Sequence, residues 1–240
     1  MGNRAAAERV VIVPSETAPG GEDVRIPAAA HTLMGFRPWA HSDRFPESGR
    51  IDYLGGDVEL DMSPEDLHTH GTLKAALAAE LFSLIAKPGR GYVFIDRTRV
   101  TAPEAELSVE PDLVVVLFSS LDSGRVRQVP SSRKLPGRFI ELEGAPDLVV
   151  EILSDTSEAK DTKRLPPRYA RAEVPELWLL DARADRLRFE LRILENGEYH
   201  LARPDRENWV HSPLLGGRVR VTRRPAHQSG WLYGLERESA

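Results

Sequence analysis

Carboxylates stand at positions where the sequence otherwise indicates buried strands. The stretch APDLVVEILSD (145–155) reads as an apolar strand except for Asp147 and Glu151, and PDLVVVLF (111–118) begins, after a proline, with Asp112. An ionised carboxylate in apolar surroundings is costly unless it has a partner or binds a metal. These three acids are therefore the first candidates for chemistry.

Strand geometry separates the three acids. Asp147 and Glu151 are four positions apart on one strand, which means about 13 Å, too far to share one metal ion or a pair of ions about 4 Å apart. Asp112 and Glu151 can converge if their strands are neighbours about 4.8 Å apart in a suitable register. We therefore predict an Asp112–Glu151 pair and assign Asp147 to capping its strand or the turn that enters it.

Two hard carboxylates suit Mg²⁺ or Mn²⁺ better than zinc, because the chain has no cysteine and few histidines. Such a cation can activate water and stabilise the charge on a phosphodiester oxygen. Sites of this kind usually also contain a lysine, and the segment after the second strand offers Lys160 and Lys163. A different interpretation stays open, in which Asp112 and Glu151 are a structural pair held by arginines or backbone donors.

The composition is that of a soluble globular protein, with 240 residues, 41% hydrophobic residues and 29% charged residues. The absence of cysteine excludes disulfides and thiolate metal sites and suits a cytoplasmic location. No apolar run approaches the roughly 20 residues that span a bilayer, so no membrane association is expected. The net charge of -5 argues against a general nucleic-acid coat protein but allows an enzyme with a local basic patch.

Such a patch is predicted between residues 119 and 142, which read as a long connection. Long connections inside a compact domain are often functional, although a solvated surface loop is equally compatible with the sequence. The predicted nucleic-acid-binding residues are Arg125, Arg127, Arg133, Lys134 and Arg138.

Secondary-structure patterns supply the elements that must position these residues. We predict a loosely ordered arm over residues 1–50 with one short helix near Phe45, a hairpin over 51–62, and a helix that begins at Ser63. Apolar runs predict strands at 92–95, 107–118, 146–153 and 176–181, covered on both faces as in an α/β sheet. A helix between the last two strands is expected to be interrupted at Pro166-Pro167, and the rest of the chain alternates like antiparallel strands. The predicted domains are residues 1–50, a core over 51–185, and a β-rich extension over 186–240.

Several segments resemble, in order, the Uma family of restriction endonucleases, compact members of the PD-(D/E)XK nuclease superfamily. The resemblance covers roughly residues 50–185 and is carried by DVELDMSPEDLHTHGTL, IDRTRV, VEPDLVVV, APDLVVEILSD, KDTKRL, Tyr169 and VPELWLLDAR. It implies an α/β (α+β) restriction-endonuclease-like core with a mixed central sheet flanked by helices, followed by the β-rich C-terminal extension.

The resemblance also implies roles for individual residues. Asp112 and Glu151 take the metal-ligand positions, and His70 takes the place of a histidine that would orient the phosphate or a water. The lysine of the superfamily signature, two residues after the acid, is replaced by Leu153. The family's alternative basic position, four residues before Tyr169, is Leu165. The catalytic lysine is then Lys160, with Lys163 as the second choice.

The resulting prediction is a Mg²⁺- or Mn²⁺-dependent DNA endonuclease that hydrolyses phosphodiester bonds. The alternative is a catalytically degenerate nuclease-fold protein that acts as a nucleic-acid-binding or assembly module, which the displaced lysine favours. A hydrolase of another phosphate ester is the weaker third reading. The expected partner is DNA, and a homodimer is left open.

Overall fold

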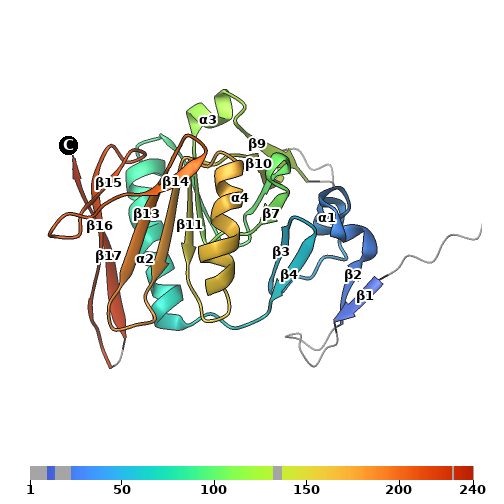
Figure 1. Cartoon of the computed structure of the whole chain (residues 1–240), viewed down its shortest axis with the longest axis horizontal. Coiled ribbons are helices and arrows are strands. Elements are labelled where there is room, and N and C mark those ends of the chain that lie inside the picture. Colours follow the sequence, from blue (N-terminus) through green and yellow to red (C-terminus); the bar gives the residue numbers. More distant parts are fainter. Residues whose placement is uncertain (1–9, 14–22, 132–136, 229, 240) are drawn as a thin grey trace, which may run out of the picture.

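Two six-stranded mixed sheets make up most of the molecule (Figure 1). The computed structural model describes residues 10–13, 23–131, 137–228 and 230–239. The central sheet has the order β14-β13-β12-β11-β8-β5 and the second sheet the order β4-β3-β7-β6-β10-β9. The strands of the central sheet are β5 (Gly91–Ile95), β8 (Leu113–Leu117), β11 (Leu148–Ile152), β12 (Glu176–Asp181), β13 (Arg188–Glu195) and β14 (Glu198–Leu201). Those of the second sheet are β3 (Arg50–Leu54), β4 (Asp57–Asp61), β6 (Arg99–Ala102), β7 (Leu107–Val109), β9 (Val126–Pro130) and β10 (Phe139–Gly144).

The central sheet confirms the predicted apolar strands, with one correction. Strand β11 pairs antiparallel with β8 and parallel with β12. The run 107–118, predicted as one strand, is two strands, because β7 belongs to the second sheet and β8 to the central sheet. Between them, residues 110–112 carry the chain from one sheet to the other. The mixed α/β core expected from the sequence is therefore correct.

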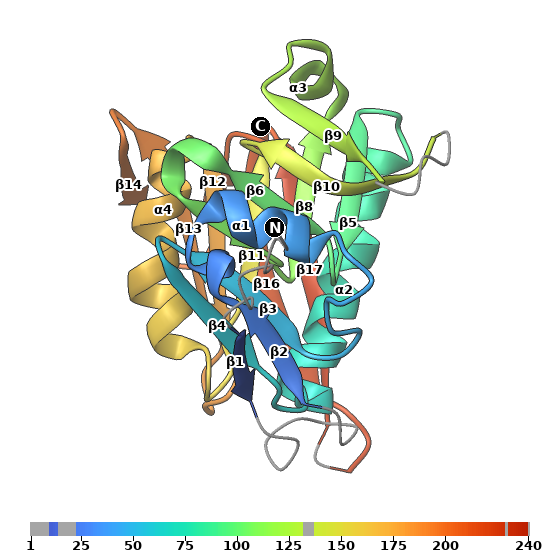
Figure 2. The ribbon, with the colours of Figure 1, turned by 90° about the vertical axis from the view of Figure 1, so that its right-hand side faces the viewer.

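Helices cover both faces of the central sheet, which explains the continuous apolar runs (Figures 1 and 2). Helix α2 (Thr72–Leu81) packs Leu73, Leu77 and Leu81 against one face, with the flanking turns η3 (Leu67–Gly71) and η4 (Phe82–Ala86) extending it. On the opposite face, α4 (Leu165–Arg171) and the second sheet cover Val149 and the neighbouring strand residues. Strand side chains are thus buried on both sides of the sheet, as apolar runs require.

The helix around α2 begins later than predicted. Asp66, not Ser63, caps its first turn, because the Asp66 carboxylate accepts hydrogen bonds from the backbone N–H groups of His68 and Thr69 at 2.9 and 2.7 Å. Ser63 instead donates its backbone N–H to the side chain of Asp61. An aspartate can fill the same capping role as a serine, which accounts for the shift of the helix start by three residues.

The predicted helix after β11 consists of the turn η6 (Lys160–Arg164) and α4. The expected interruption at Pro166-Pro167 does not occur, because Pro166 lies in the first turn of α4, where the missing N–H costs least. Tyr169 and Leu165 of this helix are buried against the central sheet.

The N-terminal elements cover the outer face of the second sheet (Figure 2). They are β1 (Val10–Val13), β2 (Val24–Pro27), η2 (Ala28–His31) and α1 (Leu33–Ala40). The predicted short helix near Phe45 is wrong, since the helix is α1 and ends at Ala40. Phe36 and Trp39 of α1 pack with Ile51 and Tyr53 of β3, so the described residues from Val24 onward share a core with the sheet.

The described residues between 119 and 142 are not an unstructured connection. They include most of α3 (Phe118–Asp122), all of β9 and the start of β10, and β9 and β10 pair antiparallel. The pairing has an irregularity between Phe139 and Glu141. The polar composition that suggested a loop is typical of an edge strand, because β9 lies at the edge of its sheet.

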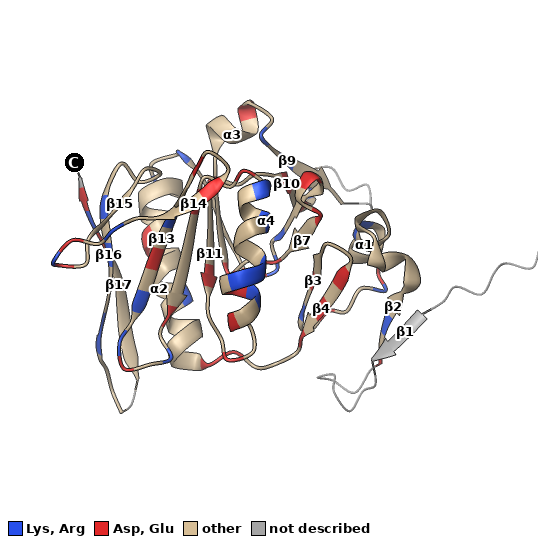
Figure 3. Ribbon diagram, viewed as in Figure 1, with Lys and Arg blue, Asp and Glu red and all other residues tan. Residues whose placement is uncertain are grey.

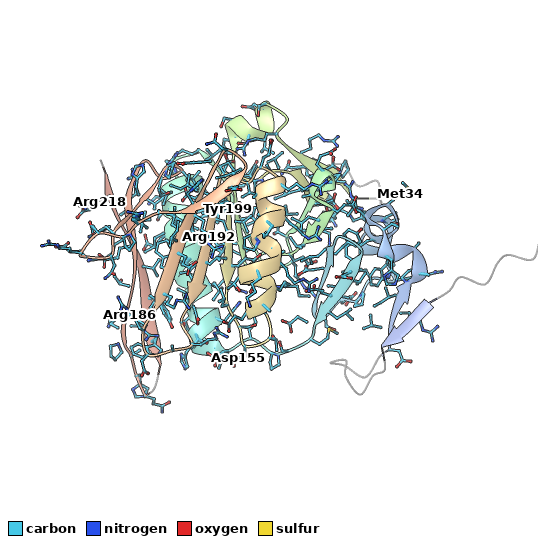
Figure 4. All side chains as sticks on the ribbon, viewed as in Figure 1. Met34, Asp155, Arg186, Arg192, Tyr199 and Arg218 are labelled. Atoms are coloured by element: carbon cyan, nitrogen blue, oxygen red, sulfur yellow. The ribbon has the colours of Figure 1, made fainter. Side chains whose placement is uncertain are left out.

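The C-terminal residues divide between two sheets. Strands β13 and β14 complete the central sheet, and β13 pairs with β12 from Glu176 to Asp181. Strands β15 (Val210–Ser212), β16 (Gly217–Pro225) and β17 (Trp231–Ser239) form a separate C-terminal sheet, in which Val219 and Leu235 join the core around α2. Met34 of α1 and Arg218 of this sheet mark opposite ends of the molecule (Figure 4). The predicted domain division at 50 and 185 stays a prediction.

A polar cluster attaches the C-terminal sheet to the central sheet. The buried carboxylate of Glu176 accepts hydrogen bonds from Ser212 Oγ at 2.7 Å, Trp178 Nε1 at 2.7 Å and the backbone N–H of Leu214 at 3.1 Å. Each of the buried polar groups in this cluster thereby has a partner, which burial requires.

Within the described ranges, no helix is long and apolar enough to cross a membrane.

Replacing Leu77 with alanine should lower the free energy of unfolding by about 2–5 kcal/mol, because its fully buried side chain fills the core between α2 and the central sheet. Urea denaturation measures this change. The matched control is Leu201→Ala on β14, whose side chain is 54% exposed and should matter by less than about 0.5 kcal/mol. Equal effects of the two substitutions would contradict this packing.

Candidate active site

Asp112 and Glu151 meet where the chain crosses between the two sheets. Strands β8 and β11 pair antiparallel with Leu113 opposite Val150, so the next step of the register sets Asp112 opposite Glu151. The backbone N–H of Ile152 donates to Asp112 Oδ2 at 2.7 Å, which confirms the proximity. The structure thus brings together the two acids that strand geometry predicted as a pair.

Asp112 is fully buried and surrounded by cations. Arg50 Nη2 of β3 is 2.6 Å from Asp112 Oδ1, Lys74 Nζ of α2 is 3.4 Å from the same oxygen, and His70 Nε2 is 3.4 Å from Oδ2. Burial alone would raise the pKa of Asp112, but Arg50, His70 and Lys74 together hold this pKa well below its usual range. Asp112 is therefore ionised in the folded protein.

Glu151 lies in a different electrostatic setting. It is also buried, and Tyr169 of α4 donates its hydroxyl to Glu151 Oε1 at 2.6 Å. Burial and the negative charges of Asp161 and Asp112 raise the pKa of Glu151 well above its usual value, although Arg50 and Lys160 oppose this shift. Two neighbouring carboxylates thus have pKa values shifted in opposite directions, an arrangement concentrated at functional sites.

The structure separates the two lysine candidates. Lys160 is buried and its Nζ is 2.9 Å from Asp52 Oδ2 on β3. Burial lowers the pKa of Lys160, but Asp52, Asp161 and Glu151 outweigh it and the net pKa is raised, so the amine stays charged. Lys163, three residues later, is exposed.

The two positions at which the resemblance predicts a lysine carry leucines, and both leucines lie in apolar surroundings. Leu153 and Leu165 are buried in the same hydrophobic cluster, between the central sheet and α4. Neither position could be filled by a lysine without placing a charge in this cluster. Lys160, in η6 before α4, instead contacts Asp52 of β3 and lies close enough to Glu151 for the two charges to interact.

Asp161 is a third buried acid that the sequence interpretation did not select. No hydrogen bond of ordinary geometry joins its side-chain oxygens to a described residue, although Ser157 lies close enough to lower its pKa. Burial raises the pKa of Asp161 to about 6, against the opposing effect of Lys160. Its only sequence signal is its place directly after Lys160, which resembles an ordinary charged helix face.

His70 lies beside Asp112, and the structure adds two neighbours that the sequence did not indicate. Among the described residues, the ligand atoms of Glu65, His70 and Asp112 all lie within 4.8 Å of one another. Lys74, one helical turn after His70, is buried and contacts Glu65 Oε1 at 2.8 Å and Asp96 Oδ1 at 2.5 Å. Burial opposes the charged form of His70, but Asp112 and Glu65 raise its pKa above the ordinary value.

Two open clefts give access to these groups. One, of about 370 Å³, is lined by Arg50, Glu65, His70 and Arg97 among others. The second, of about 300 Å³, includes Arg50, Asp52 and Lys160. Acidic and basic residues both occur on the elements that meet here, including β3, β4 and the η6–α4 segment (Figure 3).

The predicted basic residues fall into three groups. Arg125 forms an ion pair with Asp147, and Arg127 forms one with Glu143. Arg138 is exposed and lines a third cleft. Arg133 and Lys134 lie outside the described residues.

Asp147 has a structural role, but at a different turn from the one predicted. Its Oδ2 accepts the backbone N–H of Leu117 at 2.7 Å, and its Oδ1 accepts the hydroxyl of Ser120 at 2.9 Å. These bonds fix the turn between β8 and α3 beside the start of β11. Asp147 therefore has partners of its own and is separate from the Asp112–Glu151 pair.

The residues present fit a hard divalent cation. The donors are carboxylate oxygens with one imidazole, a set that suits Mg²⁺ or Mn²⁺. Asp161 adds a buried carboxylate whose only close polar neighbour of this kind among the described residues is Ser157, and a buried carboxylate ordinarily requires more partners. Asp112 belongs to the three-residue ligand set, whereas Glu151 is not a member of it.

The fold has a counterpart among solved structures. The chain is similar to a structure titled "Crystal structure of a putative nuclease belonging to DUF820" from Anabaena variabilis, with a TM-score of 0.56 and 19% sequence identity. The match covers 77% of this chain and 90% of that one. The two proteins therefore share a fold.

The family follows from the sequence model that matches residues 36–223, described as Uma2, "Putative restriction endonuclease". The chain belongs to this family. No curated protein matches the chain. The family match extends beyond the 50–185 segment on which the resemblance was first based.

Replacing Glu151 with glutamine should change how stability depends on pH. A carboxyl whose folded pKa is raised contributes stability below its ordinary pKa of 4.5, and this contribution is lost as the pH rises. The variant has no such loss, so its free energy of unfolding should gain on that of wild type as the pH rises above about 4.5. Urea denaturation in metal-free buffer over a series of pH values from 4.5 upward is the measurement.

The control for this experiment is Glu80→Gln, because Glu80 is exposed on α2. Its pH profile should match that of the wild type. Parallel profiles for wild type and Glu151→Gln would show that Glu151 titrates as an ordinary surface carboxylate.

Proposed function

We propose that the protein is a divalent-metal-dependent endonuclease that hydrolyses DNA phosphodiester bonds. The observation that carries the proposal is the pairing of Asp112 with Glu151 across neighbouring strands, with the buried Lys160 charged beside them. Family membership supports the nuclease class. The metal and the choice of DNA are the parts that the proposal adds.

Asp112 and Glu151 would hold the cation, and Asp161 is available as a further oxygen ligand. When bound, Mg²⁺ or Mn²⁺ supplies Lewis-acid stabilisation of the phosphate and promotes ionisation of water. The pKa of Glu151 is raised first by burial and then by the negative charges of Asp161 and Asp112, which a cation would offset. The electrostatics of the acids therefore support cation binding.

Lys160 would act as a fixed positive charge rather than as a base. Its raised pKa keeps it protonated at neutral pH, and its contact with Asp52 fixes its position. A charged amine in this place can orient the attacking water and stabilise the negative charge that develops on the phosphate. His70 would position Asp112 through the contact of its Nε2 atom.

Arginines at the cleft support an anionic substrate. Arg50 and Arg97 both line this cleft, whose lining also includes the acids Asp61, Glu65, Asp96 and Glu110. Arg50 is paired with Asp112, so the exposed Arg97 is the arginine that supports an anionic substrate. Side chains of this type contact nucleic-acid phosphates. A homodimer, which would let two sites reach both strands of a duplex, stays a prediction.

The purified protein should nick supercoiled plasmid DNA when Mg²⁺ or Mn²⁺ is added, and Asp112→Asn and Glu151→Gln should each reduce nicking to background. Both substitutions remove a carboxylate that would hold the cation. Gel electrophoresis measures nicking, and titration calorimetry with Mn²⁺ should show weaker binding in Asp112→Asn. Glu80→Gln is the control, and equal activity of all four proteins would remove the basis of the assignment.

The two lysines provide a sharper test of the site. Lys160→Met should reduce the nicking rate by about 100-fold to 1,000-fold, because it removes a fixed charge next to the acids. Lys163→Met should change the rate little, since that side chain is exposed. Lys160→Arg should retain part of the activity, and thermal unfolding verifies that each variant is folded. A larger loss of activity in Lys163→Met than in Lys160→Met would show that Lys160 is not the catalytic lysine.

One observation favours the alternative of a non-catalytic nuclease-fold protein. Both oxygens of Asp112 already have protein partners, Arg50 on Oδ1 and the Ile152 N–H on Oδ2. A cation at Asp112 would have to compete with Arg50 for the carboxylate. Mn²⁺ calorimetry separates the two readings, because a non-catalytic site held by Arg50 would give no binding in wild type.

A further inference from the structure

A third cleft, of about 680 Å³, lies next to the candidate active site. Arg97 and Glu110 line both this cleft and the one that contains Arg50 and His70. The two hollows are therefore neighbours on the surface, separated by the rim that Arg97 forms. We refer to the third cleft as the aromatic cleft, lined by Phe45, Phe94, Arg97, Arg138, Phe139 and Ile140 among others.

The aromatic cleft exposes large apolar side chains that a folded protein usually buries. Phe139 is 50% exposed and Ile140 is 37% exposed, although they are consecutive residues of a strand. The pairing of β10 with β9 is irregular between Phe139 and Glu141. Irregularities of this kind change the direction of side chains and are frequent beside functional sites. The local distortion of β10 thus explains how the consecutive residues Phe139 and Ile140 both line the aromatic cleft.

The exposed charge at the aromatic cleft is mainly positive. Arg97 and Arg138 are exposed, and the exposed acid of the lining is Asp43. The other acid, Glu110, contacts Arg99 Nη2 at 2.5 Å, so its charge is compensated. The cleft therefore combines aromatic side chains with arginines, and this combination is typical of sites that bind single-stranded nucleic acids.

The turn that carries Arg97 is held from the active-site side. Asp96 and Arg97 have φ values of 29° and 51°, a backbone region that residues other than glycine rarely adopt. Asp96 is fixed by Lys74 at 2.5 Å, and Lys74 in turn is 3.4 Å from Asp112. Arg97 is thus positioned at the rim between the two clefts by a chain of contacts that begins at the candidate metal ligand.

We propose that the aromatic cleft binds an unpaired nucleobase of the strand whose phosphodiester lies at Asp112 and Glu151. The base stacks on Phe139, and Arg97 contacts the phosphate between this base and the scissile position. The proposal rests on the proposed function and adds to it a preference for single-stranded or locally opened DNA. A base still paired in a duplex cannot offer its face to Phe139, because its neighbours in the helix cover it.

The test measures binding without cleavage. Single-stranded DNA of about ten nucleotides, labelled for fluorescence anisotropy, is titrated with protein in EDTA buffer, and a duplex of the same sequence is titrated in parallel. Phe139→Ala and Phe139→Leu should each weaken single-strand binding by about 5-fold to 100-fold, because both remove the aromatic ring on which the base stacks. The leucine variant keeps an apolar side chain of similar size and so separates stacking from general hydrophobic contact. Phe82→Ala should bind like wild type, since Phe82 is 58% exposed on the turn that ends the α2 helix and outside the lining of the aromatic cleft.

Oligonucleotides carrying 2-aminopurine at successive positions provide the second readout. Stacking on Phe139 should quench one position in wild type and in Phe82→Ala, and the quenching should be lost in Phe139→Ala and Phe139→Leu. Phe139→Trp should keep it, which protects the result against a folding defect of the smaller variants. Equal binding and quenching in all variants, or binding of duplex alone, overturns the subsite while leaving the nuclease proposal intact. Failure of the wild type to bind either DNA overturns both.

Discussion

The structure around the site depends on one constraint, the burial of an ionised carboxylate at Asp112. A charge in that position is stable only if opposite charges approach it, and the fold supplies them from elements far apart in the sequence. Arg50 comes from the second sheet, while His70 and Lys74 come from the helix that covers the central sheet. The residue that would bind a cation is thus also the residue that the surrounding elements must assemble around.

The same constraint explains why the neighbouring acids behave differently. Arg50, His70 and Lys74 satisfy Asp112, so little positive charge remains for Glu151 and Asp161, whose pKa values are raised by burial. The three carboxylates therefore differ before any ligand binds. Asp112 is held in the charged form, whereas an added cation would stabilise the charged forms of Glu151 and Asp161. Asymmetry of this kind lets neighbouring carboxylates take different roles in one site.

Much of this arrangement follows from local sequence patterns, and the rest follows from long-range pairing. Apolar runs indicated β8, β11 and β12, and strand spacing alone separated Asp147 from Glu151. No local pattern marked Arg50, because it begins the first strand after an irregular segment and its partner lies 62 residues away. Asp161 was missed for a similar reason, since only the tertiary fold shows that it is buried. The parallel pairing of β10 with β6 likewise has no local signature.

The crossing between the two sheets has a mechanical consequence. Residues 110–112 join β7 to β8, so four residue steps lead from Val109 to Leu113 and span at most about 14 Å when extended, against the roughly 10 Å between packed sheets. The connection therefore has little slack. Removing one residue would cut its reach to about 11 Å and draw it taut, whereas adding one would loosen it and release Asp112 from its register opposite Glu151. The length of this connection therefore helps to fix the position of Asp112 relative to Glu151.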